Sequence, residues 1–162
     1  MNPPALVALA DGSVFEGRSV GSTGDSLGEM VFNTSMTGYQ EILTDPSYAG
    51  QIVSMTYPHI GNYGVNPEDD ESSRPHVVAF LMKQCCPRPS NQRATQGLIE
   101  YMQQHGVIGV EGFDTRELTR RVRIHGVMNA VVSTDDLDSD SLVSRAREWS
   151  GLDGVDLVRD VT

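Results

Sequence analysis

Ser47 is the first residue whose setting suggests chemistry. It lies in the string TDPSY, residues 44–48, where Pro46 fixes the preceding turn. A serine hydroxyl both donates and accepts hydrogen bonds, so at a rigid corner it can hold an amide or a developing oxyanion. The surrounding stretch Gly28–Gly64 has few charges and many hydroxyl, amide and glycine residues, which suits a wall that presents polar groups to a ligand. The alternative is a serine that only caps a local turn.

Three arginines form a second candidate site. Arg116, Arg120 and Arg123 follow the spacing that places side chains on one face of a helix, opposite Leu118 and Val122. Guanidinium groups bind carboxylates and phosphates through paired hydrogen bonds, so this stripe can hold a small anion or dock a partner subunit. The alternative is a solvated helix face with local glutamate pairing.

Two cysteines are the remaining candidates for catalysis. Cys85 and Cys86 are adjacent, a position from which cysteines rarely bridge, so we expect free thiols in a reducing compartment. No glycine-rich elbow that would present a nucleophile to a histidine base surrounds them, which predicts packed, inert thiols. Neither belongs to a C-x-x-C pair and no histidine lies at ligand spacing, so we predict no metal site.

The string GSTGDSLG, residues 21–28, resembles a phosphate-binding loop only in its glycines. It lacks the GK[ST] ending, and nothing places it between a strand and the start of a helix. We predict a flexible hairpin connection there. His76, at the start of an apolar run, is predicted to be a satisfied strand residue.

The charge balance disfavours several classes of partner. The 162 residues contain 12 Lys and Arg against 22 Asp and Glu, a net charge of -10. This disfavours binding to nucleic acid and to anionic membranes. No run approaches the roughly 18 apolar residues that span a bilayer. The start, MNPPALVALADG, lacks the basic region of a secretory signal, so we expect a cytoplasmic location.

The elements that must position Ser47 are mostly strands. Short apolar or alternating runs separated by turn residues predict them in the first third, at 5–10, 13–16, 29–33 and 51–56. Residues 37–44 suit a short helix that Pro46 ends. The segment Asn62–Pro75, with four consecutive acids and two prolines, is predicted to be a solvated loop.

The arginine stripe belongs to a half in which strands and helices alternate. Asp114 with Glu117 three residues on forms a capping box, which predicts where the helix begins, and Gly126 predicts where it ends. Strands are predicted on both sides of this helix, at 107–110 and 128–133.

Three further elements complete the second half. The continuous apolar run 76–82 predicts a strand buried on both faces. Thr95 is expected to cap a helix that reaches Gln104, and Asp138 or Ser139 to cap the last helix. The apolar residues expected to face the core are Leu98, Tyr101 and Met102 in the first of these helices and Leu142, Ala146 and Trp149 in the second.

A β-rich half followed by strand and helix alternation predicts an α/β fold. In such a fold one sheet carries helices and a second sheet packs on it. The length is that of one domain, and we expect a single domain over residues 1–162.

Two long strings carry a resemblance to a known family. VFNTSMTGYQEILTDPSYAGQIV with TYPHIGNYG, in residues 31–64, and GVIGVEGFDTRELTRRVRIHGVMNAVVS, residues 106–133, resemble the N-terminal domain of the small, glutamine-using chain of carbamoyl phosphate synthetase. The opening LADGSVFEGRSVGSTGDSLGE is similar as well. Two separated strings in the right order are far more specific than a lone glycine motif.

The resemblance implies a three-layer β/β/α fold of the swivelling type, in agreement with the α/β prediction. It implies that the serine of this motif, Ser47, reaches across a domain boundary to bound L-glutamine without being the nucleophile. It also implies that the helix of Arg116, Arg120 and Arg123 is structural and subunit-contact surface. We therefore predict a glutamine-binding role for Ser47, an interface role for the arginines and no catalytic residue.

A complete small chain of this family continues into a class I glutamine amidotransferase domain, whose Cys, His and Glu are absent here. We therefore predict that this chain alone does not hydrolyse glutamine. The implied partners are that amidotransferase domain, L-glutamine and the large chain, on which ATP and magnesium are expected; no cofactor is expected in this chain. The complex makes carbamoyl phosphate for arginine and pyrimidine synthesis. The alternatives are a free-standing small-anion-binding module that uses the arginine stripe and, third, a cysteine hydrolase.

Overall fold

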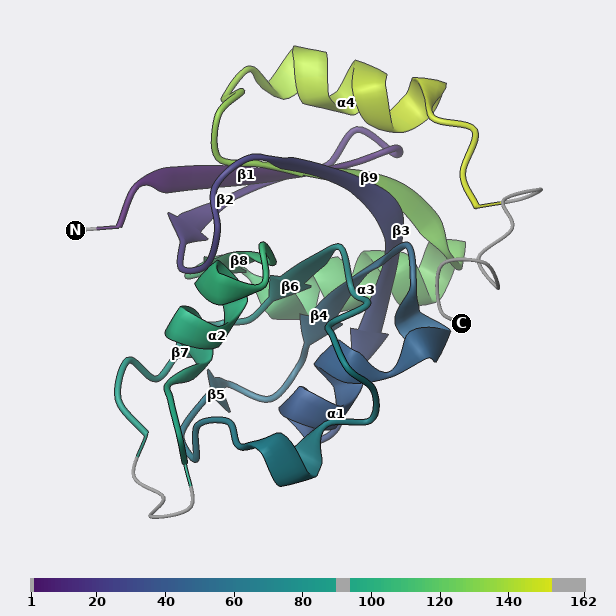
Figure 1. The fold of residues 1–162 in the computed structure, drawn as a ribbon. Helices are drawn as coiled ribbons and strands as arrows, with labels where there is room; N and C mark the ends of the chain where they lie inside the picture. The colour runs from purple at the N-terminus through teal and green to yellow at the C-terminus, as the bar shows by residue number, and fades with distance from the viewer. Residues whose placement is uncertain (1, 90–93, 153–162) are drawn as a thin grey trace.

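A computed structural model describes residues 2–89 and 94–152 (Figure 1). The strands of this part are β1 Pro4–Leu9, β2 Val14–Ser19, β3 Asp25–Asn33, β4 Gln51–Met55, β5 His59–Ile60, β6 Ala79–Leu81, β7 Gln84–Cys85, β8 Ile108–Glu111 and β9 Met128–Ser133. The helices are α1 Tyr39–Thr44, α2 Leu98–Gln104, α3 Thr115–His125 and α4 Ser139–Glu148, with short 3-10 turns η1 Pro46–Tyr48 and η2 Pro67–Asp69. The α/β mixture with a β-rich first half is confirmed. Residues 153–162 of the predicted domain lie outside the described residues.

Seven of the described strands close into a barrel in the order β1-β2-β8-β6-β4-β3-β9. β9 closes it by pairing antiparallel with both β1 and β3. β3, β4, β6 and β8 run parallel, so their carboxyl ends meet at one edge. The three-layer arrangement of the swivelling type is not confirmed, because these strands form one closed barrel instead of two stacked sheets.

Inward-facing side chains fill the barrel. Alternate residues of β1 enter this interior cluster, as strand geometry requires, and they meet residues from β3, β4, β6, β8 and β9 there. α3 contributes Leu118 and Val122 to the same cluster, so this helix covers part of the interior. The expectation that these two residues face away from the arginines is confirmed.

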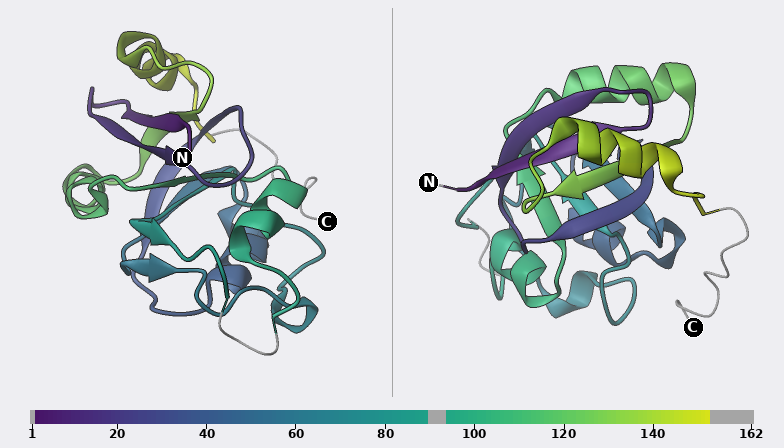
Figure 2. Two further views of the ribbon diagram at one scale, coloured as in Figure 1. Left: turned by 90° about the vertical axis from the view of Figure 1, so that its left-hand side faces the viewer. Right: turned by 90° about the horizontal axis from the view of Figure 1, so that it is seen from above.

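The outside of the barrel carries helices in two places. α4 lies across β1 and β9, where Leu142 and Ala146 pack against the outward residues Leu6, Ala8 and Val131 (Figure 1). α1 and α2 pack with the outer faces of β4 and β6 in a second cluster. Figure 2 shows α2 and α3 on opposite sides of the barrel strands.

β6 confirms the prediction of a strand buried on both faces. Ala79 and Leu81 point into the barrel cluster, whereas Phe80 between them points into the outer cluster. The strand is shorter than predicted. His76 precedes it, and its ring Nε2 lies 3.0 Å from the Ser72 hydroxyl. The buried His76 is therefore satisfied, but it is not a strand residue.

The hairpin predicted in residues 21–28 is wrong. Residues 21–24 lead from β2, which pairs with β1 and β8, to β3, which includes residues 25–28 and pairs with β4 and β9. The two strands that they join are therefore not partners. The Ser22 hydroxyl faces the carbonyl oxygens of Met102 and Gln103, at 3.3 Å from each.

Helix caps were predicted with mixed success. Asp138 caps α4 and Gly126 ends α3, as expected. Thr95 does not cap α2, which begins after Gly97, because the Thr95 hydroxyl donates to the Val65 carbonyl oxygen at 3.2 Å. The three apolar residues predicted on the inner face of α2 are buried. Of those predicted for α4, Leu142 and Ala146 are buried, whereas Trp149 is the half-buried residue that ends the helix.

The acidic loop is tied to the body of the protein at Asn66. Gln40 of α1 is 1% exposed, and its side-chain amide accepts a hydrogen bond from the Asn66 amide at 2.9 Å. The same side chain donates to the Asn66 carbonyl oxygen and to Asp70 Oδ1. Residues 62–75 contain η2 and an isolated bridge of Val65 with Gln96 but no strand or α-helix, so the loop prediction is confirmed, although the start of the loop is anchored in the interior.

Candidate functional site: a serine turn and a basic helix face at opposite barrel edges

Ser47 lies in η1, between α1 and β4. Pro46 occupies the first position of this turn, and the Asp45 side chain accepts a hydrogen bond from the Ser47 amide at 2.9 Å. The proline ring and the capping carboxylate together fix the backbone here. Ser47 is exposed, and no hydrogen bond of its hydroxyl is found among the described residues. The hydroxyl is therefore available at the surface.

The turn is held from both sides. The Tyr48 hydroxyl accepts a hydrogen bond from Asn33 Nδ2 at 3.0 Å, and the Tyr48 ring packs against the outer core cluster. On the other side Gly50 has φ +77°, and a Cβ on it would meet Leu152 Cδ2 at 2.7 Å. The chain that follows α4 therefore returns to the Ser47 turn, and Gly50 allows this close approach.

The three predicted arginines lie together on α3. Arg116, Arg120 and Arg123 line a common cavity of about 470 Å³. Lys83, which follows β6, lines it as well, and the remaining lining residues are threonines and one proline. No carboxylate lines this cavity within the described part of the chain. We call these four cationic residues and the space between them the basic cavity.

Within the described part of the chain, only one of these three arginines, Arg120, has an ion-pair partner. Arg120 donates to both carboxylate oxygens of Glu117, at 2.8 and 3.0 Å, and Arg121 donates to one of them at 3.0 Å. The Arg120 hydrogen bond lowers the pKa of Glu117 from its ordinary value. The predicted capping box is thus half formed: Asp114 accepts from the Glu117 amide at 3.0 Å, but the Glu117 carboxylate faces the arginines.

The structure does not bring Ser47 and the arginines together. Ser47 comes directly before β4, at the amino end of that strand. The basic cavity lies at the opposite edge of the barrel, because its residues follow the carboxyl ends of β3, β4, β6 and β8. The two predicted sites therefore face different neighbours.

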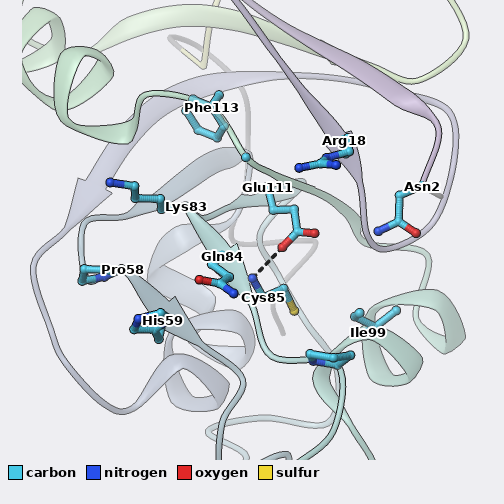
Figure 3. Close-up of a pocket in the computed structure, with 12 residues that line it drawn as sticks. Asn2, Arg18, Pro58, His59, Lys83, Gln84, Cys85, Ile99, Glu111 and Phe113 are labelled. Carbon is cyan, nitrogen blue, oxygen red and sulfur yellow. Dashed lines mark hydrogen bonds between the residues drawn. The ribbon is translucent and has the colours of Figure 1, made fainter.

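A larger cavity, of about 710 Å³, lies next to the basic cavity and shares Lys83 with it (Figure 3). In this view the Glu111 carboxylate lies between Arg18 and Cys85, and Gln84 lies beside Cys85. The sequence prediction missed this cavity, because its residues come from separate segments and share no motif. A polar residue follows each parallel strand, and this signal could have predicted the cavity, because the carboxyl ends of parallel strands often border ligand sites in α/β folds.

Cys85 is buried at this cavity, and both cysteines are free, as predicted. The Glu111 carboxylate accepts a hydrogen bond from the Cys85 amide at 2.7 Å. Burial, with the nearby Glu111 charge, raises the pKa of the Cys85 thiol to about 12. A thiol of this kind is a poor nucleophile at neutral pH, which argues against the cysteine-hydrolase alternative.

We expect the Cys85 thiol to resist alkylation in the folded protein. With Cys86→Ser as the background, iodoacetamide should modify Cys85 at about pH 8 at least ~100-fold more slowly than it does in urea, where the thiol has its ordinary pKa. Intact-mass spectrometry over time measures both rates. Equal rates in the two states would contradict the buried position.

The described residues contain neither a group of metal ligands nor a membrane-spanning helix. Within 2–89 and 94–152, no three His, Cys, Asp or Glu side chains are grouped as metal ligands would be. None of the helices in the same ranges is both long and apolar enough to cross a bilayer.

Residues 7–132 match the family described as carbamoyl-phosphate synthase small chain, CPSase domain. The carbamoyl phosphate synthase small chain of Syntrophotalea carbinolica is 56% identical over 158 residues, which cover 98% of this chain and 42% of that protein. That of Nitratidesulfovibrio vulgaris strain DSM 19637 is 58% identical over 157 residues, 97% of this chain and 42% of that protein. That of Thermotoga maritima is 53% identical over 157 residues, 97% of this chain and 40% of that protein. The chain spans about two fifths of the length of these curated relatives.

Among solved structures, an aminopeptidase from Aneurinibacillus sp. strain AM-1 is similar over 82% of this chain and 31% of its own. The sequence identity is 13% and the TM-score 0.46.

Proposed function

Because the chain belongs to the family of carbamoyl phosphate synthase small chains, we propose that it serves as the N-terminal domain of the small subunit of glutamine-dependent carbamoyl phosphate synthase. In this proposal the domain docks to the large subunit and contributes Ser47 to the glutamine site. The small subunit releases ammonia from glutamine, and the large subunit, with ATP and magnesium, uses it to make carbamoyl phosphate for arginine and pyrimidine synthesis. This chain alone is inactive and holds no cofactor.

The exposed Ser47 turn is the observation that carries the glutamine role. A proline and a capping aspartate fix its backbone, so a hydroxyl there is preorganised to bind a polar group of a ligand. Leu152, close to the end of the described chain, packs on Gly50 beside this turn. In the family that the sequence resembles, the amidotransferase domain comes after this one. The position of Leu152 supports a location of that domain near Ser47.

The proposal also includes a single domain over residues 1–162 without the amidotransferase domain, a layering of the swivelling type and a cytoplasmic location. The alternative of a free-standing anion-binding module is not favoured, since the matched relatives are named as small chains of a synthase.

We expect Ser47→Ala, in a full-length small subunit assembled with the large one, to slow glutamine-dependent synthesis roughly 3- to 10-fold. This is the effect of one lost neutral hydrogen bond. Synthesis from added ammonia should be unchanged, because it bypasses the glutamine site. Steady-state rates with each nitrogen donor measure the two effects.

Ser144→Ala is the matched control, because Ser144 is also exposed but lies on α4. It should change neither rate. Unchanged glutamine kinetics in Ser47→Ala would remove Ser47 from the glutamine site. An equal loss with both nitrogen donors would point to a defect in assembly.

A further inference from the structure

The cavity of about 710 Å³, which we call the Arg18 cavity, has the size and position of a small-molecule site. Ligand pockets usually have volumes of roughly 300–1,000 Å³. Lys83 follows the parallel strand β6, and Gly112 and Phe113 follow β8, so the cavity lies at the carboxyl ends of these strands. Ligands of α/β folds often bind at such ends. The location therefore favours a bound ligand over an incidental hollow.

Two hydrogen bonds hold the walls of this cavity together. The Gly112 amide donates to the Lys83 carbonyl oxygen at 2.9 Å, and the Cys85 amide donates to Glu111 Oε2 at 2.7 Å. Both join the chain that follows β6 to the end of β8, so a shift of either wall would break them. A site whose walls are fixed before binding loses less conformational freedom when it takes a ligand.

A cation and an anion lie next to each other on one wall. Arg18 and Glu111 are directly opposite residues of the antiparallel pair β2 and β8, so their side chains leave the same face of the sheet. Glu111 Oε2 is bound by the Cys85 amide, and Arg18 Nε and Nη2 would each lie 3.7 Å from a Cβ on Gly112. No ion pair of Arg18 and no hydrogen bond of Glu111 Oε1 is found within residues 2–89 and 94–152. Both groups can therefore bind a ligand.

A second cation lies across the cavity. Lys83 is the only lysine of the 162 residues, and it is exposed and has no ion-pair partner in the described part of the chain. In Figure 3 it lies on the other side of Glu111 from Arg18. Two cations and one carboxylate give the cavity a net positive charge with His59 neutral, although the chain as a whole is acidic. The apolar walls are formed by Pro58, Pro87, Ile99 and Phe113.

We propose that the Arg18 cavity binds an acidic amino acid of the class of L-aspartate. The α-carboxylate pairs with the Arg18 guanidinium, the α-ammonium group with Glu111 Oε1, and the side-chain carboxylate with Lys83. An α-amino acid carries its ammonium and carboxylate groups on one carbon, which matches the adjacent Glu111 and Arg18. A plain anion would instead place its charge beside the Glu111 carboxylate. The two carboxylates and one ammonium group of the ligand also balance the net charge of the cavity.

The first test compares three probes on a full-length small subunit by isothermal titration calorimetry. L-Aspartate should bind with a dissociation constant of roughly 0.1–1 mM, as expected for a small ligand held by a few charge pairs. Succinate lacks the ammonium group, and L-asparagine lacks the side-chain charge. Each should bind at least ~10-fold more weakly than L-aspartate, because each loses one charge-assisted hydrogen bond.

The second test assigns each charge of the ligand to a residue. Glu111→Gln should abolish the preference for L-aspartate over succinate, and Lys83→Gln the preference for L-aspartate over L-asparagine. Glutamine at 111 keeps the size of the side chain and an oxygen that can accept from the Cys85 amide, so the change reports the lost charge. Arg18→Gln should weaken binding of L-aspartate and L-asparagine alike, at least ~10-fold. A loss of structure would instead weaken all three probes in every variant.

The matched control is Arg147→Gln. Arg147 is an exposed arginine on α4, the helix that packs outside the barrel on β1 and β9. It should leave the dissociation constant of L-aspartate within about twofold, because it lies outside the Arg18 cavity. Thermal unfolding of each variant confirms that it is folded before the affinities are compared.

Three outcomes would overturn the proposal. The wild type may show no heat of binding with L-aspartate at roughly 10 mM. It may bind L-aspartate and succinate equally well. Alternatively, Arg116→Gln abolishes binding while Arg18→Gln does not, which would assign the anion to the basic cavity. Each of these outcomes leaves the proposed function standing, because the Ser47 turn lies at the opposite barrel edge and is tested through glutamine-dependent synthesis.

Discussion

Gly17→Val should lower the thermal unfolding midpoint of this protein by roughly 10 °C, which corresponds to about 3 kcal/mol of unfolding free energy for a chain of this length. Gly17 lies in β2, where that strand meets β8. A Cβ at this position would lie 2.5 Å from the Glu111 carbonyl oxygen and 2.7 Å from Val110 Cγ1. The backbone oxygen cannot move without loss of the pairing between β2 and β8.

The effect should be large because the added side chain meets backbone atoms of β8, the neighbouring strand of the closed barrel. β2 pairs with β8 through Arg18 with Glu111 and Ser19 with Val110, and just beyond β2 the Val20 amide donates to the Gly109 carbonyl oxygen at 3.0 Å. A shift of β2 therefore disturbs the closure of the barrel at this point. Differential scanning calorimetry measures the midpoint. The control is Gly97→Ala, where the added Cβ has only ordinary contacts at 3.7 Å and φ is -79°. An unchanged midpoint in Gly17→Val would mean that β2 does not approach β8 as closely as described.

Gln40→Glu should lower the unfolding free energy by about 3 kcal/mol at neutral pH, because it places a carboxylate in a buried site beside Asp70, where no described Lys or Arg lines the adjoining cavity. The wild-type amide nitrogen donates to the Asn66 carbonyl oxygen and to Asp70 Oδ1. A carboxylate oxygen in its place would face both of these acceptors. The change preserves the size of the side chain, so the loss reports charge and hydrogen bonding.

The pH dependence of this variant follows from the same burial. We expect burial and the Asp70 charge to raise the folded-state pKa of the carboxyl group that Gln40→Glu introduces above the unfolded value of about 4.3. The destabilisation should therefore be full above the folded-state pKa and vanish as the pH falls through the unfolded value. Urea unfolding at a series of pH values measures it. Gln103→Glu, at an exposed position on α2, should show no such dependence. A loss that does not change with pH would show that charge is not its cause.

Local sequence patterns predicted most elements because each pattern acts within a few residues. Asp114, Asp138 and Gly126 satisfy backbone groups of the helix turn next to them, so their effect needs no distant partner. The same holds for the arginine stripe, whose common face follows from helical spacing alone. Thr95 is an exception that local patterns do not predict. Its hydroxyl donates to the carbonyl oxygen of Val65, thirty residues away in the sequence, and does not cap a helix.

The composition and the two long strings were enough to determine the family, the pattern of strands and helices, the free cysteines and the two candidate sites. Only the tertiary structure decided that β9 joins β1 to β3 and so closes the barrel. It also decided that Ser47 and the arginines lie at opposite edges, and that Lys83 joins the arginines in one cavity. These outcomes depend on which strands pair, and strand pairing is a contact between segments far apart in the chain that no local spacing encodes.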